Sequence, residues 1–133
     1  MLKVEHIGIA VRTLAESVPL FEKLLNSQCY KTEVVQGEKV NTAFFKTKDT
    51  KIELLESIDE NGVISKFIDK KGEGLHHIAF EVDNIETEME RLKSEGFILL
   101  NENPKKGADN KLVCFLHPKS TNGVLIELCE EIK

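Results

Sequence analysis

The 133-residue sequence predicts an α+β fold made of two tandem βαβββ modules. Two observations carry this prediction. The second half of the chain repeats the residue pattern of the first, and each half runs from a strand through a helix to further strands. Apolar residues alternate with period two in the strand segments and follow a helical period between them, which distinguishes the two kinds of element.

The internal repeat is visible when the sequence is compared with itself. Residues 4–11 (VEHIGIAV) resemble residues 75–82 (LHHIAFEV), with His77 standing 71 positions after His6. Residues 51–56 (KIELLE) resemble residues 125–130 (LIELCE), with a shift of 74 positions. The agreement in apolar period and in His and Glu positions favours two copies of one supersecondary unit over two generic strand–helix units.

In the first half, residues 3–11 alternate as a strand does and a helix is expected next. Thr13 and Glu16 have the spacing of a capping box, and Pro19 predicts a kink in this helix. The apolar stripe that would pack on the sheet comprises Leu14, Val18, Phe21 and Leu25.

The second half follows the same order, with a strand at 75–82 and then a helix. Asp83 or Asn84 can cap this helix, and Gly96 is a natural end for it. Its apolar stripe comprises Ile85, Met89 and Leu92.

Shorter strands complete each module. In the first half they are expected at 30–35, 40–47 and 50–56, and in the second at 97–101, 111–116 and 123–130. A short helix carrying Val63, Ile64, Phe67 and Ile68 is expected between the halves. The whole chain is therefore predicted to be a single domain, with module one at about 1–56, a junction at 57–73 and module two at about 74–133.

Composition excludes several classes of function. The formal net charge is −5 with no long basic run, which argues against nucleic acid and anionic membranes as partners. No apolar run approaches the roughly 20 residues that span a bilayer, and the N-terminus shows no signal peptide. The three cysteines lie far apart, as expected of free thiols in a reducing cytoplasm.

Two histidines and two glutamates occupy equivalent places in the repeat. By strand alternation His6 shares a face with small residues, and so does His77, which suggests a cavity beside each imidazole. Glu53 and Glu127 alternate with large aliphatic residues in strands expected to be central. A carboxylate buried there needs a cation or hydrogen bonds.

A pseudo-twofold axis between the modules would bring both His/Glu pairs to one point. Two imidazoles and two carboxylates suit a divalent ion such as Co²⁺, Zn²⁺, Ni²⁺, Mn²⁺ or Fe²⁺. A lone strand histidine is more often structural and a lone strand glutamate is usually exposed. The repeated arrangement favours a metal site formed by His6, Glu53, His77 and Glu127.

The neighbouring polar residues are interpreted differently. His76 has the opposite parity from His77 and is expected to be structural, and His117 should contact backbone or ligand. Cys129 shares its parity with Glu127 and could line a cavity, without a motif that would make it a nucleophile. Solvated or rim charges are expected at Glu5, Glu56, Glu81 and Glu130.

Four segments carry a resemblance to a known family: HIGIAV, KIELLE, GEGLHHIAFEVDNI and HPKSTNGVLIELCE. With them the sequence resembles the vicinal oxygen chelate (glyoxalase) superfamily, and most closely its methylmalonyl-CoA epimerase branch. The resemblance implies paired modules forming a half-barrel sheet around one metal bound by His6, Glu53, His77 and Glu127, and usually a homodimer. Some epimerases of the family carry an additional acid on the third strand, whereas residues 40–43 here contain no carboxylate.

The resemblance implies a metal-dependent epimerase that removes and returns a proton beside a thioester, with an acyl-CoA as substrate. Glu53 and Glu127 come from opposite halves and would flank the intermediate, so these two glutamates are expected to be the catalytic carboxylates. Lactoylglutathione lyase is an alternative, because it can use the same ligands. A binding protein without activity and a ring-cleaving dioxygenase are less consistent with four filled ligand positions. Lysines that could meet CoA phosphates, or be ordinary surface charges, are Lys105, Lys106, Lys111 and Lys119.

Overall fold

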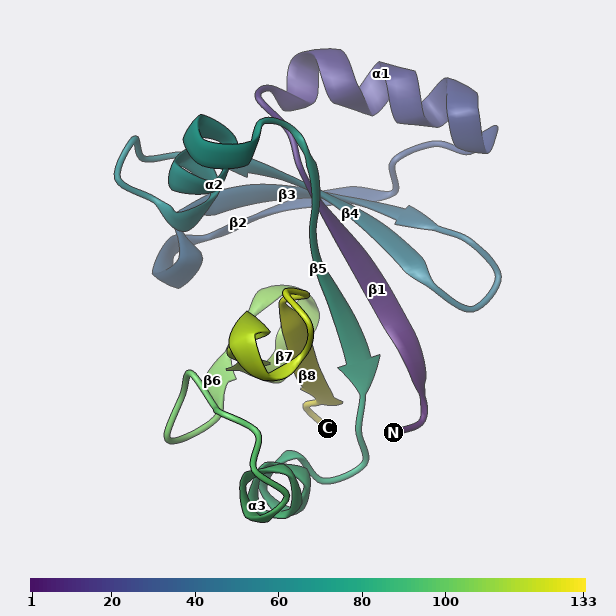
Figure 1. Ribbon diagram of the computed structural model, residues 1–133. Helices are drawn as coiled ribbons and strands as arrows, with labels where there is room; N and C mark the ends of the chain where they lie inside the picture. The colour runs from purple at the N-terminus through teal and green to yellow at the C-terminus, as the bar shows by residue number, and fades with distance from the viewer. The chain divides into compact units, whose positions relative to one another are not determined.

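A computed structural model describes residues 1–133 as two compact units, drawn together in Figure 1. The first unit is His6–His76, and the second combines Met1–Glu5 with His77–Lys133. Strand β1 (Lys3–Ala10) therefore contributes residues to both units.

The first unit places a helix on each face of its strands. Its elements are α1 (Leu14–Leu25), β2 (Lys31–Val35), the 3₁₀ helix η1 (Gln36–Glu38), β3 (Val40–Lys46), β4 (Lys51–Ser57) and α2 (Val63–Lys71). The strand order is β2-β3-β4-β1, with β1 parallel to β4 and the other pairs antiparallel. The stripe of α1 packs on a buried cluster from one sheet face, Ala43, Phe45 and Leu54. Residues of α2 pack on Ala10, Val40 and Leu55 from the other face.

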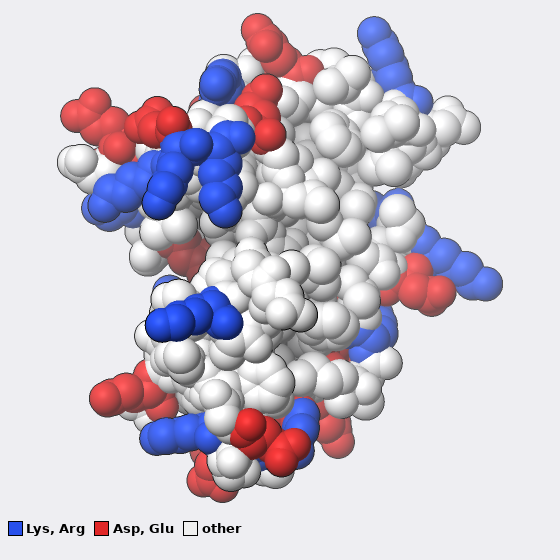
Figure 2. Space-filling model, in the orientation of Figure 1, with Lys and Arg blue, Asp and Glu red and all other residues white.

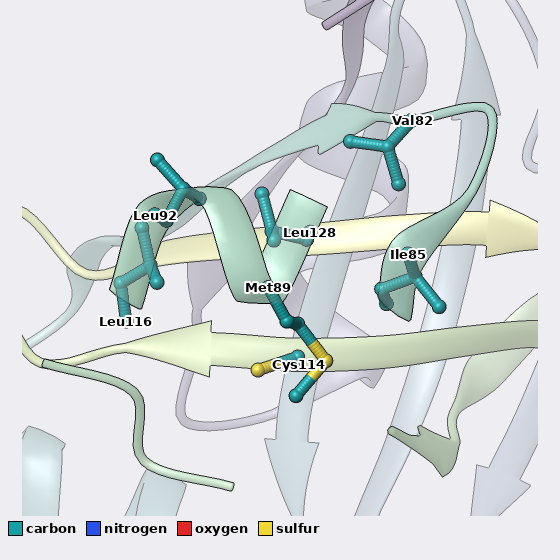
Figure 3. Close-up of a cluster of buried hydrophobic side chains, with 7 residues drawn as sticks. All are labelled: Val82, Ile85, Met89, Leu92, Cys114, Leu116 and Leu128. Atoms are coloured by element: carbon teal, nitrogen blue, oxygen red, sulfur yellow. The ribbon is translucent and has the colours of Figure 1, made fainter. Parts of the chain in front are cut away.

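The second unit repeats this plan with one long helix. Its elements are β5 (Gly74–Glu81), whose first residues lie in the first unit, α3 (Ile85–Ser94), β6 (Lys105–Lys106), η2 (Ala108–Asn110), β7 (Lys111–Leu116), η3 (Pro118–Ser120) and β8 (Ile126–Glu131). The strand order is β5-β8-β7-β6, with β5 parallel to β8. Figure 3 shows α3 over its core cluster, Val82, Ile85, Met89, Leu92, Cys114, Leu116 and Leu128.

The predicted helix ends are confirmed. Thr13 caps α1 by accepting the Glu16 N–H, and the Asn84 side chain caps α3 by accepting the Thr87 N–H. Gly96 follows α3 with φ of +99°, a conformation that favours glycine at a helix end. The short helix expected between the modules is α2, and α1 runs without interruption through Pro19.

Two predicted strands were wrong in extent. Residues 97–101 form only an isolated bridge between Leu99 and Leu116, and β6 comes later as two residues. The Asn101 side chain accepts the Phe115 N–H at 2.9 Å, so a side chain takes the place of a ladder bond there. The last strand begins at Ile126 rather than at residue 123, because the preceding residues form a turn.

Both long helices begin on a glutamate from the last strand of their own module. Glu56 Oε1 accepts the Leu14 N–H at 2.8 Å, and Glu130 Oε1 accepts the Ile85 N–H at 2.7 Å. A carboxylate at a helix N-terminus accepts a hydrogen bond from an otherwise unpaired N–H. Its negative charge is also attracted to the partial positive charge of the helix dipole at that end. Glu56 and Glu130 were predicted as solvated or rim charges; both are only partly buried, and the helix contact that each makes was not predicted.

Replacing Glu130 by Ala is expected to lower the free energy of unfolding by about 1 kcal/mol, as loss of a helix cap does. The melting temperature should fall by about 3 °C in thermal unfolding followed by circular dichroism. Glu131→Ala on the same strand is the matched control, because Glu131 is exposed. Equal effects of the two substitutions would show that the contact with Ile85 does not stabilise the fold.

The molecular surface carries mixed charge on the face drawn in Figure 2. Lysine and arginine side chains are interspersed there with aspartate and glutamate, and no continuous basic surface covers that face. None of the helices has the length and apolar character needed to cross a membrane.

Candidate metal site

The first His/Glu pair lies on the sheet of the first unit. Strand β1 runs parallel to β4 with Gly8 opposite Glu53. His6 Nδ1 lies 3.2 Å from Glu53 Oε2. His6 is 5% exposed and Glu53 is 3% exposed, so the imidazole and the carboxylate are both buried. Gly8 adds no side chain to this face of the sheet.

The second pair lies on the sheet of the second unit. Strand β5 runs parallel to β8 with Ala79 opposite Glu127. His77 Nε2 lies 3.1 Å from Glu127 Oε1, and both residues are buried. The Phe115 ring meets the His77 ring edge to face, with centroids 5.8 Å apart, and so restricts the orientation of the imidazole.

The two pairs have the same register. In each, the histidine stands two residues before the small residue that lies opposite the glutamate. The internal repeat in the sequence therefore yields the same local geometry twice. The pairs differ in one respect, because His6 approaches its glutamate through Nδ1 and His77 through Nε2.

The donor chemistry of these pairs fits a divalent metal ion. A buried carboxylate is costly unless a cation or a hydrogen bond compensates its charge. Imidazole nitrogen and carboxylate oxygen are the mixed donors that borderline divalent ions prefer. One pair alone supplies only two donors, whereas protein sites for such ions generally use at least three protein ligands. Each pair therefore supplies part of the donor set that such an ion needs.

A third buried polar pair was missed in the sequence. Glu5 was predicted as a solvated or rim charge, but it is 2% exposed, and its Oε2 lies 3.9 Å from Lys111 Nζ. The side chain of Lys111 is itself only 9% exposed, so this lysine is not a surface charge available to a phosphate. Burying both partners makes the ion pair self-compensating, because neither charge is left alone.

The other two histidines have structural contacts. The His76 ring meets the Phe67 ring edge to face with centroids 5.0 Å apart, in agreement with the structural role predicted for it. His117 Nδ1 accepts the Lys119 N–H at 2.9 Å at the start of a 3₁₀ helix. This backbone contact is one of the two kinds expected for His117.

The buried cysteines lie in surroundings that disfavour the reactive thiolate. Cys114 and Cys129 are fully buried, and Cys29 is partly buried. Burial raises the pKa of both buried thiols, and for Cys129 the charges of Glu127 and Glu5 raise the pKa further. A thiol with a raised pKa remains protonated at neutral pH and reacts slowly.

Comparison with known proteins places this geometry in a family. The model of the Glyoxalase/Bleomycin resistance protein/Dioxygenase superfamily matches residues 5–115. The chain belongs to this superfamily. The match includes His6, Glu53 and His77, and so covers three of the four residues of the two pairs. The α+β, glyoxalase-like fold expected from the sequence is confirmed.

Similar proteins within the superfamily include epimerases. The uncharacterized protein YqjC of Bacillus subtilis is 38% identical over 130 residues, covering 98% of this chain and 93% of YqjC. The mitochondrial methylmalonyl-CoA epimerase of Dictyostelium discoideum is 38% identical, covering 97% of this chain and 78% of that protein. A variant of the Streptomyces coelicolor methylmalonyl-CoA epimerase, solved in complex with 2-nitronate-propionyl-CoA, is 31% identical with a TM-score of 0.95, covering 98% of this chain and 95% of that one.

Proposed function

We propose that this chain is a metal-dependent epimerase acting on the carbon α to a thioester, with methylmalonyl-CoA as substrate. The observation that carries the proposal is the pair of buried His/Glu contacts in identical registers. Similarity to methylmalonyl-CoA epimerases over nearly the whole chain supports the choice of substrate.

In this proposal His6, Glu53, His77 and Glu127 together hold one divalent ion. When bound, the ion supplies a Lewis acid that stabilises negative charge developing on substrate oxygens. The two histidines contribute neutral nitrogen donors from β1 and β5. The glutamate side chains would supply oxygen donors and negative charge to offset the charge of the ion, and all four residues are buried.

The glutamates also carry the proton in this mechanism. One carboxylate takes the α-proton, so the C–H bond breaks and its electron pair moves toward the thioester carbonyl to give an enolate. The other glutamate, which starts the reaction as a carboxylic acid, then gives its proton to the opposite face of the carbon and becomes a carboxylate. The substrate is neither oxidised nor reduced, and the product differs from it only in the configuration of the α-carbon. Each carboxylate has two oxygens, so one oxygen can bind the ion while the other accepts a proton.

Lactoylglutathione lyase is the second candidate, and one observation favours it. The stretch of β3 where some epimerases carry an additional acid contains Thr42 and no carboxylate. One observation weighs against it. The only arginines are Arg12 and Arg91, and Arg91 already binds both carboxylate oxygens of Glu88 at 3.0 Å. A clamp for the glutathione carboxylates therefore has few candidate residues.

Incubation of the metal-loaded protein with methylmalonyl-CoA in D₂O tests the proposal. We expect deuterium at the α-carbon, detected by mass spectrometry of the recovered thioester, and no exchange after removal of metal with a chelator. Methylglyoxal with glutathione is assayed in parallel by absorbance. Consumption of the hemithioacetal without exchange into methylmalonyl-CoA would contradict the epimerase proposal in favour of the lyase.

A further inference from the structure

Thr42 is the residue whose polar group the fold leaves unsatisfied. It lies in β3, is 1% exposed, and its hydroxyl has no hydrogen-bond partner in the protein. A buried hydroxyl without a partner lowers the stability of the fold, because the lost contact with water is not replaced. A valine would fill the same space without that cost. The hydroxyl is therefore unexplained by the packing of the fold.

The strand register places Thr42 on the face of the His6–Glu53 pair. Strands β3 and β4 are antiparallel, with Phe44 opposite Glu53 and Thr42 opposite Leu55. Directly opposite side chains share a face, and so do residues two apart along a strand. Thr42 therefore projects from the same face as Glu53, on the neighbouring strand and two residues from the position directly opposite it.

The surroundings of Thr42 on this face are mostly apolar. Its neighbours along β3 are Val40 and Phe44, and α2 packs on Val40 and Leu55. The opposite face is occupied by the cluster that packs on α1. A hydroxyl among apolar side chains, directed to the face that carries a buried carboxylate, has the setting of a polar group that fixes a bound ligand.

We propose that the Thr42 hydroxyl binds substrate, by hydrogen-bonding an oxygen of the acyl thioester held beside Glu53. This inference rests on the proposed function. The hydroxyl donates its proton to a carboxylate or carbonyl oxygen of the substrate, so the bond strengthens as negative charge develops on that oxygen. No covalent bond to Thr42 forms or breaks. Thr42 thereby becomes a specificity residue for substrates that present an oxygen at this position.

Three variants test the inference in the full-length, metal-loaded protein. Thr42→Val removes the hydroxyl and keeps the shape, whereas Thr42→Ser keeps the hydroxyl and removes a methyl group. Thr32→Val is the matched control, because Thr32 is exposed and lies opposite Ala43, on the other sheet face. The measurements are the melting temperature, the affinity for methylmalonyl-CoA by calorimetry, and kcat and KM for epimerisation.

We expect Thr42→Val to keep or raise the melting temperature, by up to about 3 °C, because the unsatisfied hydroxyl is gone. The same variant should lose about tenfold or more in kcat/KM and in affinity for methylmalonyl-CoA. Thr42→Ser should retain most of both, and Thr32→Val should match the unchanged protein. Opposite signs for stability and activity are the signature of a hydroxyl kept for a ligand.

Other outcomes overturn the inference. A lower melting temperature for Thr42→Val would show that the hydroxyl stabilises the fold. Turnover and affinity within twofold of the unchanged protein, or equal losses in the Val and Ser variants, would show that the hydroxyl does not contact substrate. If the unchanged protein binds methylmalonyl-CoA without epimerising it, the proposed reaction fails, and the affinities still decide the role of Thr42. If it does neither, both proposals fall.

Discussion

Glu127→Gln is expected to lower the turnover of methylmalonyl-CoA by about 10²- to 10⁴-fold, the usual contribution of a proton-transferring side chain. Glutamine has nearly the same shape and keeps an oxygen that can bind a metal. It loses the negative charge and the ability to accept a proton at neutral pH. Because Glu127 is buried against His77, no neighbouring water readily replaces its carboxylate. The measurement is α-proton exchange with metal content determined on the same sample.

We expect the same loss from Glu53→Gln, because the proposed mechanism uses one carboxylate on each side of the α-carbon. Glu131→Gln is the control, since Glu131 lies in the same strand as Glu127 and is exposed. Undiminished turnover by Glu127→Gln with its metal still bound would remove this carboxylate from the proton transfer. Loss of metal from the variant would show that Glu127 is needed to hold the ion.

Leu128→Ala is expected to lower the free energy of unfolding by about 3 kcal/mol, within the range measured for buried leucines. Leu128 is fully buried in the cluster of Figure 3, where it packs beneath α3 with Met89 and Leu92. The substitution removes three side-chain carbons, so less apolar surface is buried and a cavity is left. The melting temperature should fall by about 10 °C in thermal unfolding. Urea unfolding measures the change in free energy directly.

Leu100→Ala serves as the comparison, because Leu100 is 50% exposed. Its effect should remain within about 0.5 kcal/mol, as for surface substitutions generally. Similar losses at the two positions would contradict the assignment of Leu128 to the core. Leu128 also follows Glu127 directly in β8, so a loosened core in this variant should reduce activity together with stability.

The sequence was sufficient to predict the parts of the fold that follow from local pattern and repetition. Strand alternation alone predicted that His6 and Gly8 share one sheet face. It also predicted that Glu127 and Leu128 point to opposite faces. The capping pair at Thr13 and the stop at Gly96 are local chemistry and were also predicted correctly. Placing each histidine beside its glutamate required the repeat, because one copy gives no indication of which strands pair.

Contacts between strands far apart in sequence could be predicted only where the repeat indicated them. Glu5 and Lys111 are separated by most of the chain, and each alone has the sequence context of a surface charge. Their burial depends on contacts between parts of the chain that no local pattern connects. The helix contacts of Glu56 and Glu130 were missed for a similar reason, although their equivalent places in the repeat were a usable signal.

The missing strand at 97–101 has a local cause that a pattern of apolar residues does not reveal. The segment is apolar enough for a strand, but Asn101 uses its side chain to bond Phe115. Pro104 then follows without an N–H to donate to a ladder. A single polar side chain thus changes how the backbone donors of β7 are satisfied, and pairing resumes only at Lys105.

The central claim is that the two His/Glu pairs serve one metal ion, and the number of ions bound per chain tests it most directly. Metal-free protein is titrated with Co²⁺ or Zn²⁺ by calorimetry and checked by elemental analysis. We predict one ion per chain, lost both in His6→Ala and in His77→Ala. Two ions per chain, or one ion retained after either histidine is removed, would contradict the account.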